Sequence, residues 1–119
     1  MSYFYLATPY SRYPHGLRAA WQEACRNAAI LAEAGVPIFS PIAMTYGMEN
    51  YLNKDHAFWM GVDRPMMESA KGCIMCRMQS WDVSRGMAQE LQIFQEAGKP
   101  VIWMDPGVIP DEFLEFSNV

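Results

Sequence analysis

The pattern of apolar and polar positions predicts strands and helices that alternate along the chain. From Leu17 to Leu31, apolar residues recur at helical spacing, and this pattern stops before Gly35. A second helical pattern follows Ser84 and ends near Ala97. Short apolar runs bounded by glycine, proline or polar residues predict buried strands at about 1–7, 36–40, 72–78 and 100–104.

Two similar segments indicate how these elements are joined. Glu33 to Phe39 and Glu96 to Ile102 each read as a helix end, a glycine and a buried strand started by proline. Such joins predict an α/β fold, a mostly parallel sheet with helices on both faces. Between them, Pro41 to Asp63 has no clear period and is interpreted as a lid, with helix following as far as Lys71. One or two helical turns are expected at 111–116.

Length and charge restrict the classes of function. The 119 residues, 51% of them hydrophobic, are enough for one domain spanning 1–119. The net charge of -4 and the absence of a basic run argue against polymeric nucleic acid as a partner. No apolar window approaches the roughly 20 residues that span a bilayer, and the N-terminus has no signal pattern. We therefore expect no membrane partner and a cytoplasmic location.

The cysteines and histidines do not indicate a metal site. Three cysteines and ten methionines suit a reducing compartment better than a disulfide framework. Cys73 and Cys76 form a C-x2-C motif, but in a strand residues three apart point to opposite faces. His15 and His56 follow no metal spacing. We expect no metal and no cofactor.

The stretch from Trp81 to Glu90 is the first place to look for chemistry. Ser84 is placed to cap the helix that follows, and a helix start of this kind binds anions. Glu90 lies beside the apolar stripe of that helix, whereas Gln89 points to the far side. A buried carboxylate is costly unless it is paired, so Glu90 is a candidate for catalysis. The alternative is a carboxylate paired with a lysine or arginine at the rim of the core.

Parallel sheets bind ligands beyond the carboxyl ends of their strands. This rule places the loop from Thr8 to Gly16 beside the loop from Gln79 to Arg85. Tyr5, near the end of the first strand, would then lie within reach of Glu90. By itself, Tyr5 also fits a core tyrosine whose hydroxyl is satisfied.

These residues resemble a known family. Tyr5-Leu6-Ala7-Thr8-Pro9-Tyr10-Ser11, with Ser84-x-Gly86-x3-Glu90 and Ala97-Gly98-Lys99-Pro100-Val101, is similar to the nucleoside 2-deoxyribosyltransferase superfamily, and within it to the small DUF1937 group. The resemblance implies a flavodoxin-like, three-layer fold with four to five parallel strands. It also implies an enzyme that cleaves or exchanges the N-glycosidic bond of deoxynucleosides or nucleoside 5'-monophosphates.

The resemblance also implies roles for single residues. Glu90 would be the nucleophile that attacks the anomeric carbon, and Tyr5 would orient its carboxylate. Transferases place an aspartate six residues before the nucleophile, whereas monophosphate hydrolases place a serine there for the 5'-phosphate; this chain has Ser84. Arg12 resembles an arginine with which the hydrolases hold phosphate. The likeness therefore favours an N-glycosidase acting on a (deoxy)nucleoside 5'-monophosphate.

An acid is needed to protonate the leaving base, and the sequence does not choose among Asp63, Asp82 and Asp55. Asp63 is kept as the first candidate. The expected partner is a small-molecule nucleotide or nucleoside. The candidate substrate-binding residues are Thr8, Pro9, Tyr10, Ser11, Arg12, Trp81, Ser84, Arg85 and Gly86.

One departure from the family pattern keeps alternatives open. Superfamily members commonly begin the third strand with an aspartate, where this chain has Lys71-Gly72-Cys73. The alternatives are a nucleoside deoxyribosyltransferase and a nucleotide-binding module without activity. A flavin-binding electron carrier shares the fold, but the first loop lacks the Ser, Thr and Gly run expected to cradle a phosphate. The likeness also predicts a homodimer or homotetramer whose subunits complete each other's pockets.

Overall fold

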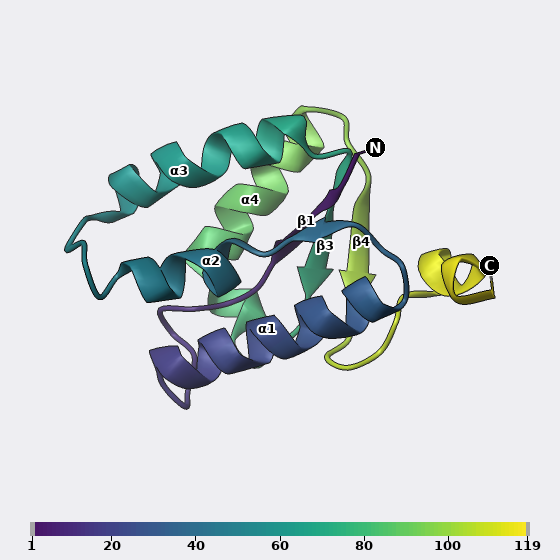
Figure 1. The fold of residues 1–119 in the computed structure, drawn as a ribbon. Helices are drawn as coiled ribbons and strands as arrows, with labels where there is room; N and C mark the ends of the chain where they lie inside the picture. Colours follow the sequence, from purple (N-terminus) through teal and green to yellow (C-terminus); the bar gives the residue numbers. More distant parts are fainter. Residues whose placement is uncertain (1, 119) are drawn as a thin grey trace.

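The computed structural model describes residues 2–118, in which a parallel sheet lies between layers of helices (Figure 1). The strand order is β2-β1-β3-β4, and every neighbouring pair is parallel. This is the order of the first four strands in flavodoxin-like folds, so the predicted fold class is confirmed. The strands are β1 (Phe4–Ala7), β2 (Ile38–Phe39), β3 (Gly72–Cys76) and β4 (Val101–Met104).

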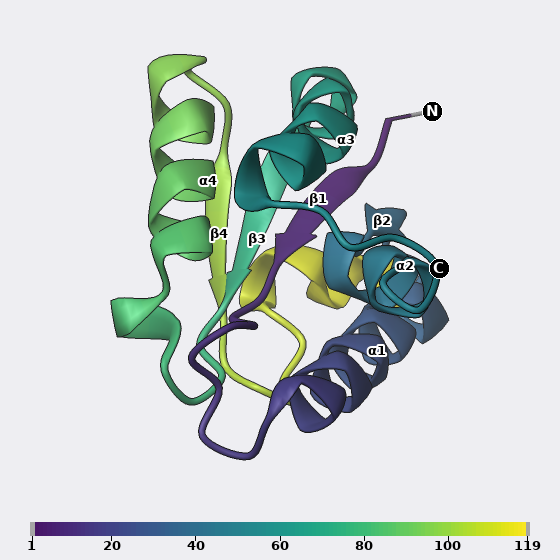
Figure 2. The ribbon, with the colours of Figure 1, turned by 90° about the vertical axis from the view of Figure 1, so that its left-hand side faces the viewer.

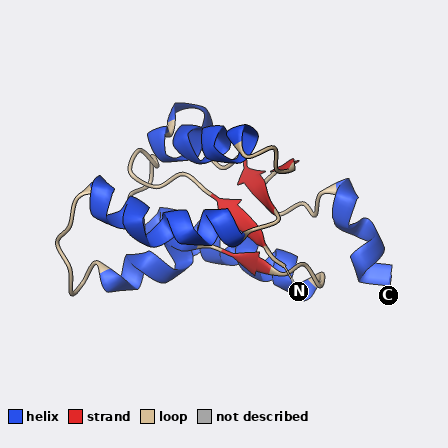
Figure 3. Cartoon of the chain, turned by 90° about the horizontal axis from the view of Figure 1, so that it is seen from above, coloured by secondary structure: helices blue, strands red, loops and turns tan. Residues whose placement is uncertain are grey.

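Helices cover both faces of the sheet, as Figure 3 shows from above. One face packs against α1 and the C-terminal η2, and the other packs against α3 and α4. The short α2 follows β2 and lies against α1 (Figure 2). The helical elements are α1 (Leu17–Glu33), α2 (Pro41–Met48), α3 (His56–Ser69), η1 (Trp81–Val83), α4 (Arg85–Glu96) and η2 (Asp111–Asn118).

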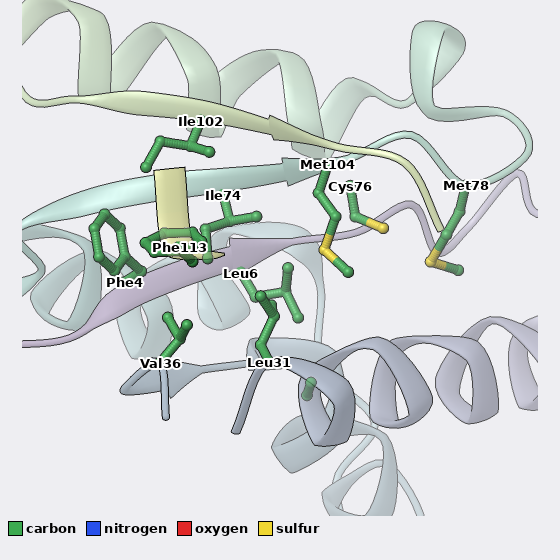
Figure 4. Close-up of a cluster of buried hydrophobic side chains, with 11 residues drawn as sticks. Phe4, Leu6, Leu31, Val36, Ile74, Cys76, Met78, Ile102, Met104 and Phe113 are labelled. Carbon is green, nitrogen blue, oxygen red and sulfur yellow. The ribbon is translucent and has the colours of Figure 1, made fainter. Parts of the chain in front are cut away.

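The strand period sorts side chains between two cores. Phe4 and Leu6 of β1 point to the α1 face, where they join the cluster drawn in Figure 4, whereas Tyr5 points to the α3 and α4 face. Cys76 lies in the first core and Cys73 in the second, so the prediction of opposite faces is confirmed. Within residues 2–118 these thiols are free.

The two predicted helix-to-strand joins are confirmed. Gly35 and Gly98 follow α1 and α4 with φ angles of 88° and 69°, a left-handed conformation that glycine adopts at little cost. Each join leads directly into a short strand. All four strands are shorter than predicted, because the outer residues of each apolar run lie beyond the paired part of the sheet.

The segment 41–63, which showed no clear period and was interpreted as a lid, forms regular helices. This segment forms α2 and the first half of α3, which then ends at Ser69 rather than Lys71. Ser40 caps α2 by accepting a hydrogen bond from the Ala43 amide at 3.3 Å, and Asp55 caps α3 by accepting one from the Phe58 amide at 3.0 Å. Both helices therefore begin at recognisable caps, although glycine and methionine obscure their periods.

At the C-terminal end, η2 begins at Asp111 as a 3-10 helix, so the expected helical turns are present. Phe113 is buried and its ring meets that of Phe4 edge to face, with ring centres 5.0 Å apart. Within the described part of the chain, no helix combines the length and apolarity needed to cross a membrane.

Candidate active site

A cavity of about 450 Å³ opens beyond the carboxyl ends of β1 and β3. Its walls come from the loop after β1 and from α2, α3 and the start of α4. The cavity lies where the parallel-sheet rule predicts a ligand. Of the residues singled out from the sequence, it is lined by Thr8, Tyr10, Ser11, Asp63, Ser84, Arg85, Gly86 and Glu90.

Glu90 and Tyr5 form a buried pair behind the cavity surface. The Tyr5 hydroxyl donates a hydrogen bond to Glu90 Oε2 at 2.5 Å. Tyr5 is 0% exposed and Glu90 is 8% exposed, and Glu90 lines the cavity. None of the ion pairs found in residues 2–118 includes Glu90. The predicted reach between the two side chains is confirmed, and the alternative of a lysine or arginine partner is not observed.

This environment disfavours a negative charge on Glu90. Burial raises its pKa from 4.5 to about 8; the bond from Tyr5 opposes that rise, and the nearby charge of Asp63 adds to it. Burial, followed by the charge of Glu90, raises the pKa of the Tyr5 hydroxyl well above its ordinary value. Tyr5 therefore remains a hydrogen-bond donor, and one carboxylate oxygen of Glu90 is left for a ligand.

Asp63 is a second carboxyl group at the same cavity. Burial raises its pKa from 3.8 to about 6, and the charge of His56 partly opposes this. Asp63 Oδ1 and Thr8 Oγ1 are buried, and neither has a hydrogen-bond partner within residues 2–118. Because buried polar groups are normally paired, two unpaired oxygens at one cavity indicate a place for a ligand's donors.

The other two candidates for the acid lie elsewhere. Asp82 is exposed in η1 and does not line the cavity, and Asp55 is exposed and caps α3. Of the three aspartates that the sequence left open, the structure brings Asp63 alone to the cavity.

The start of α4 forms another part of the wall. Ser84 Oγ accepts a hydrogen bond from the Met87 amide at 3.2 Å, which confirms the predicted cap. Arg85 and Gly86 follow and also line the cavity. A Cβ on Gly86 would meet nothing closer than Ser84 Oγ at 4.0 Å. The glycine thus leaves space in the cavity and does not relieve a clash.

Three predicted substrate-binding residues are not part of the cavity wall. Pro9 is fully buried, and Arg12 is exposed in the turn after β1. The Trp81 ring lies 5.5 Å from that of Trp103, and the Arg77 guanidinium lies over both rings. Trp81 therefore packs at the β4 side of the sheet, away from the cavity.

The residues that the sequence reasoning did not select come mainly from α2 and α3. His56 Nε2 and Gln89 Oε1 are hydrogen-bonded at 2.7 Å, which links the start of α3 to α4. Gln89 is exposed, as the helical pattern predicts, but it faces α3 at the cavity. The Ser40 and Asp55 caps were the available signals for these helices. The lining residues outside the candidate set are Pro41, Ile42, Thr45, Glu49, His56, Trp59, Met60 and Gln89, of which the sequence alone suggests Trp59 as a residue that could stack on a nucleobase.

The structure gives a steric reason for the glycine at the start of β3. A Cβ at Gly72 would lie 2.8 Å from the Pro100 carbonyl oxygen and 3.1 Å from the Phe4 ring. An aspartate could not be accommodated there without moving the backbone of the neighbouring segment.

Comparison with known proteins identifies the fold and the family. The search of curated proteins found no match. Among solved structures, the chain is similar to the 2-deoxyribosyltransferase of the psychrotolerant bacterium Bacillus psychrosaccharolyticus. That similarity has a TM-score of 0.56 and 22% identity, and it covers 98% of this chain and 82% of the other. The model of the domain of unknown function DUF1937 matches residues 2–106. The chain therefore belongs to the DUF1937 family and has a nucleoside 2-deoxyribosyltransferase-like fold.

Proposed function

We propose that this protein is an N-glycosidase that hydrolyses the base–sugar bond of a (deoxy)nucleoside 5'-monophosphate, with Glu90 as the nucleophile. The observation that carries the proposal is the buried Glu90 carboxyl group, which accepts a hydrogen bond from the Tyr5 hydroxyl at 2.5 Å and belongs to a residue that lines the cavity. A buried carboxyl group with a strongly raised pKa is costly to keep, and such groups concentrate at functional sites.

In the first step, a Glu90 oxygen attacks the anomeric carbon of the sugar as the bond from that carbon to the base nitrogen breaks. The electron pair of the broken bond leaves with the base, and the Asp63 carboxyl group donates the proton that the base takes up. The product is a sugar ester of Glu90, with Asp63 ionised. Tyr5 is a positioning residue, because its hydroxyl fixes one oxygen of Glu90 and leaves the other free to react.

In the second step, water attacks the same carbon while Asp63 accepts a proton from that water. The ester bond breaks, and Glu90 leaves as a carboxylate. The free protein disfavours two charges, since the charge of Asp63 raises the pKa of Glu90. One proton shared between the two carboxyl groups is therefore the expected state near neutral pH. The positive charge that develops on the sugar favours the form with the proton on Asp63.

The start of α4 supports a monophosphate as substrate. The free amides at a helix start bind anions, and Ser84 and Arg85 line the same wall. Arg12 is exposed outside that wall, so we assign the phosphate to Arg85 instead. The serine at 84 also favours hydrolysis over transfer, as its family likeness implies.

Transfer of the sugar to a second base is the second candidate function. It is favoured by the fold shared with a 2-deoxyribosyltransferase. The two reactions share the first step and differ only in whether water or another base attacks the Glu90 ester.

One experiment tests both. The protein is incubated with nucleosides and nucleoside 5'-monophosphates, and free base is measured by chromatography, with and without a second base. We expect base release that Glu90→Gln abolishes and that Glu96→Gln, an exposed change on the same helix, retains. Mass spectrometry should detect a sugar adduct on Glu90. Binding of nucleotides without release or exchange would instead identify a binding module.

A further inference from the structure

Glu49 is a carboxylate of the cavity that the proposed reaction does not use. It follows the last residue of α2 and lines the cavity wall. The Tyr10 hydroxyl, from the loop after β1, donates a hydrogen bond to Glu49 Oε2 at 2.5 Å. Glu49 Oε1 has no hydrogen-bond partner among the residues that the structure describes. One oxygen is therefore fixed by the protein, and the other is available to a ligand.

The position of Glu49 is supported by aromatic rings that extend to α1. The Tyr10 ring meets the Tyr46 ring edge to face at 6.4 Å, and Tyr46 stacks on Trp21 at 4.9 Å. Burial and the bond to Glu49 raise the pKa of the Tyr10 hydroxyl above its ordinary value, so it remains a donor. The carboxylate is held in place before any ligand arrives, which reduces the entropy lost on binding.

The wall around Glu49 suits a flat, mostly apolar ring. Pro41 and Ile42 of α2 and Trp59 and Met60 of α3 line the same cavity. Apolar and aromatic walls with one fixed polar group are typical of sites that hold a nucleobase by stacking and read its edge.

The arrangement of the helices separates the two ends of the cavity. Figure 2 places α2 and α4 on opposite sides of β1 and β3. The charge of Asp63 affects the pKa of Glu90, whereas the charge of Glu49 affects that of Tyr10. With phosphate at the start of α4 and the anomeric carbon at Glu90, the part of the cavity lined by α2 is left for the base, and Glu49 lines that part.

We propose that Glu49 reads the edge of the base and makes guanine nucleotides the preferred substrates; this inference rests on the nucleotide hydrolysis proposed above. An ionised carboxylate only accepts hydrogen bonds. Guanine presents two neighbouring donors, the ring N1–H and the 2-amino group. Hypoxanthine has the ring N–H but lacks the amino group. Adenine and cytosine have an amino group, but the ring nitrogen beside it is a hydrogen-bond acceptor. Uracil and thymine place their N–H between two carbonyl oxygens, which a carboxylate repels.

The test measures binding and turnover separately. Binding of dGMP, dIMP, dAMP, dCMP, TMP and GMP is measured by calorimetry with Glu90→Gln, which keeps the nucleotides intact. We expect dGMP to bind at least about tenfold more tightly than dIMP, because the unpaired carboxylate penalises loss of one donor. On the Glu90→Gln background, a second substitution Glu49→Gln should bring the ratio of the dGMP and dIMP affinities close to one. Glu68→Gln, a matched change on α3 outside the cavity, should preserve that ratio.

Tyr10→Phe leaves Glu49 charged but unfixed, and it should reduce the dGMP to dIMP ratio partly. Thermal unfolding of each variant checks that the fold is kept. Guanine preference in binding that depends on Glu49, together with no base release by the unaltered protein, would support the reading of the base by Glu49 and refute the hydrolysis.

Base release with equal kcat/KM for dGMP and dIMP would refute the inference and leave the hydrolysis standing. A Glu49→Gln effect on the GMP to dGMP ratio alone would show that Glu49 contacts the sugar, which also overturns the inference. Absence of binding by every nucleotide would overturn both proposals.

Discussion

Replacing Glu90 by glutamine should stabilise the protein, and more so as the pH rises. The folded state raises the pKa of Glu90 from 4.5 to about 8. Below pH 4.5, both the folded and the unfolded state hold the proton. Between 4.5 and 8, the unfolded state releases it while the folded state keeps it, so the free energy of unfolding falls as the pH rises. Above pH 8, the loss is complete.

The structure gives the size of this effect. Moving the pKa from 4.5 to about 8 corresponds to about 5 kcal/mol, at about 1.4 kcal/mol per pH unit. We take this figure as the largest gain expected from the neutral amide. The glutamine carbonyl oxygen still accepts the Tyr5 hydrogen bond, so the substitution removes the charge while retaining the contact and most of the volume.

Urea unfolding at pH 5, 7 and 9 measures the difference. The free energy of unfolding of Glu90→Gln, minus that of the unaltered protein, should increase from pH 5 to pH 9 by several kcal/mol. Glu96→Gln makes the same chemical change at an exposed position of α4 and should give a difference that does not vary with pH. A pH-independent difference for Glu90→Gln would refute the argument that burial disfavours the Glu90 charge.

Four further outcomes are expected. Tyr5→Phe removes the hydrogen bond that favours ionised Glu90, so the acidic limb of the kcat/KM profile should move to higher pH; an unmoved limb would contradict that role. Asp63→Asn should slow the single-turnover release of the base by about 10²- to 10⁴-fold on ordinary nucleotides, but much less on N7-methylguanine nucleotides, whose base leaves without protonation; equal losses in this first step would exclude Asp63 as the acid. Arg85→Ala should raise KM for monophosphates and leave nucleosides unaffected, and a uniform rise would place the phosphate elsewhere. Light scattering at micromolar concentration should give a dimer or tetramer mass, and a monomer would contradict the predicted assembly.

Much of the fold follows from local features that a sequence displays directly. These features are the strand and helix periods, the Ser84 cap and the glycines after α1 and α4. Each depends on only a few neighbouring residues, so it can be recognised without knowledge of the rest of the chain. Parallel strands then bring their carboxyl ends to one edge of the sheet. This rule is enough to place Tyr5 near Glu90, although they are 85 residues apart.

The middle of the chain was harder to interpret, because its helices pack in ways that their composition does not show. The caps at Ser40 and Asp55 begin α2 and α3, but glycine and methionine weaken the helical pattern between and after them. Without these helices, no wall opposite α4 could be placed. The sequence therefore could not place Glu49, Trp59 and His56 relative to Glu90.

By itself, the sequence determined the sheet, its helix joins and the buried carboxyl group of Glu90, because period, capping and strand direction are local or follow from connectivity. Only the tertiary structure decided which side chains share the cavity. It brought in Asp63 and Glu49 from α3 and α2, and it left Arg12 and Trp81 outside, although both lie in the loops predicted to form the site. Side-chain direction at a site depends on the packing of elements distant in sequence, and no local pattern encodes that packing.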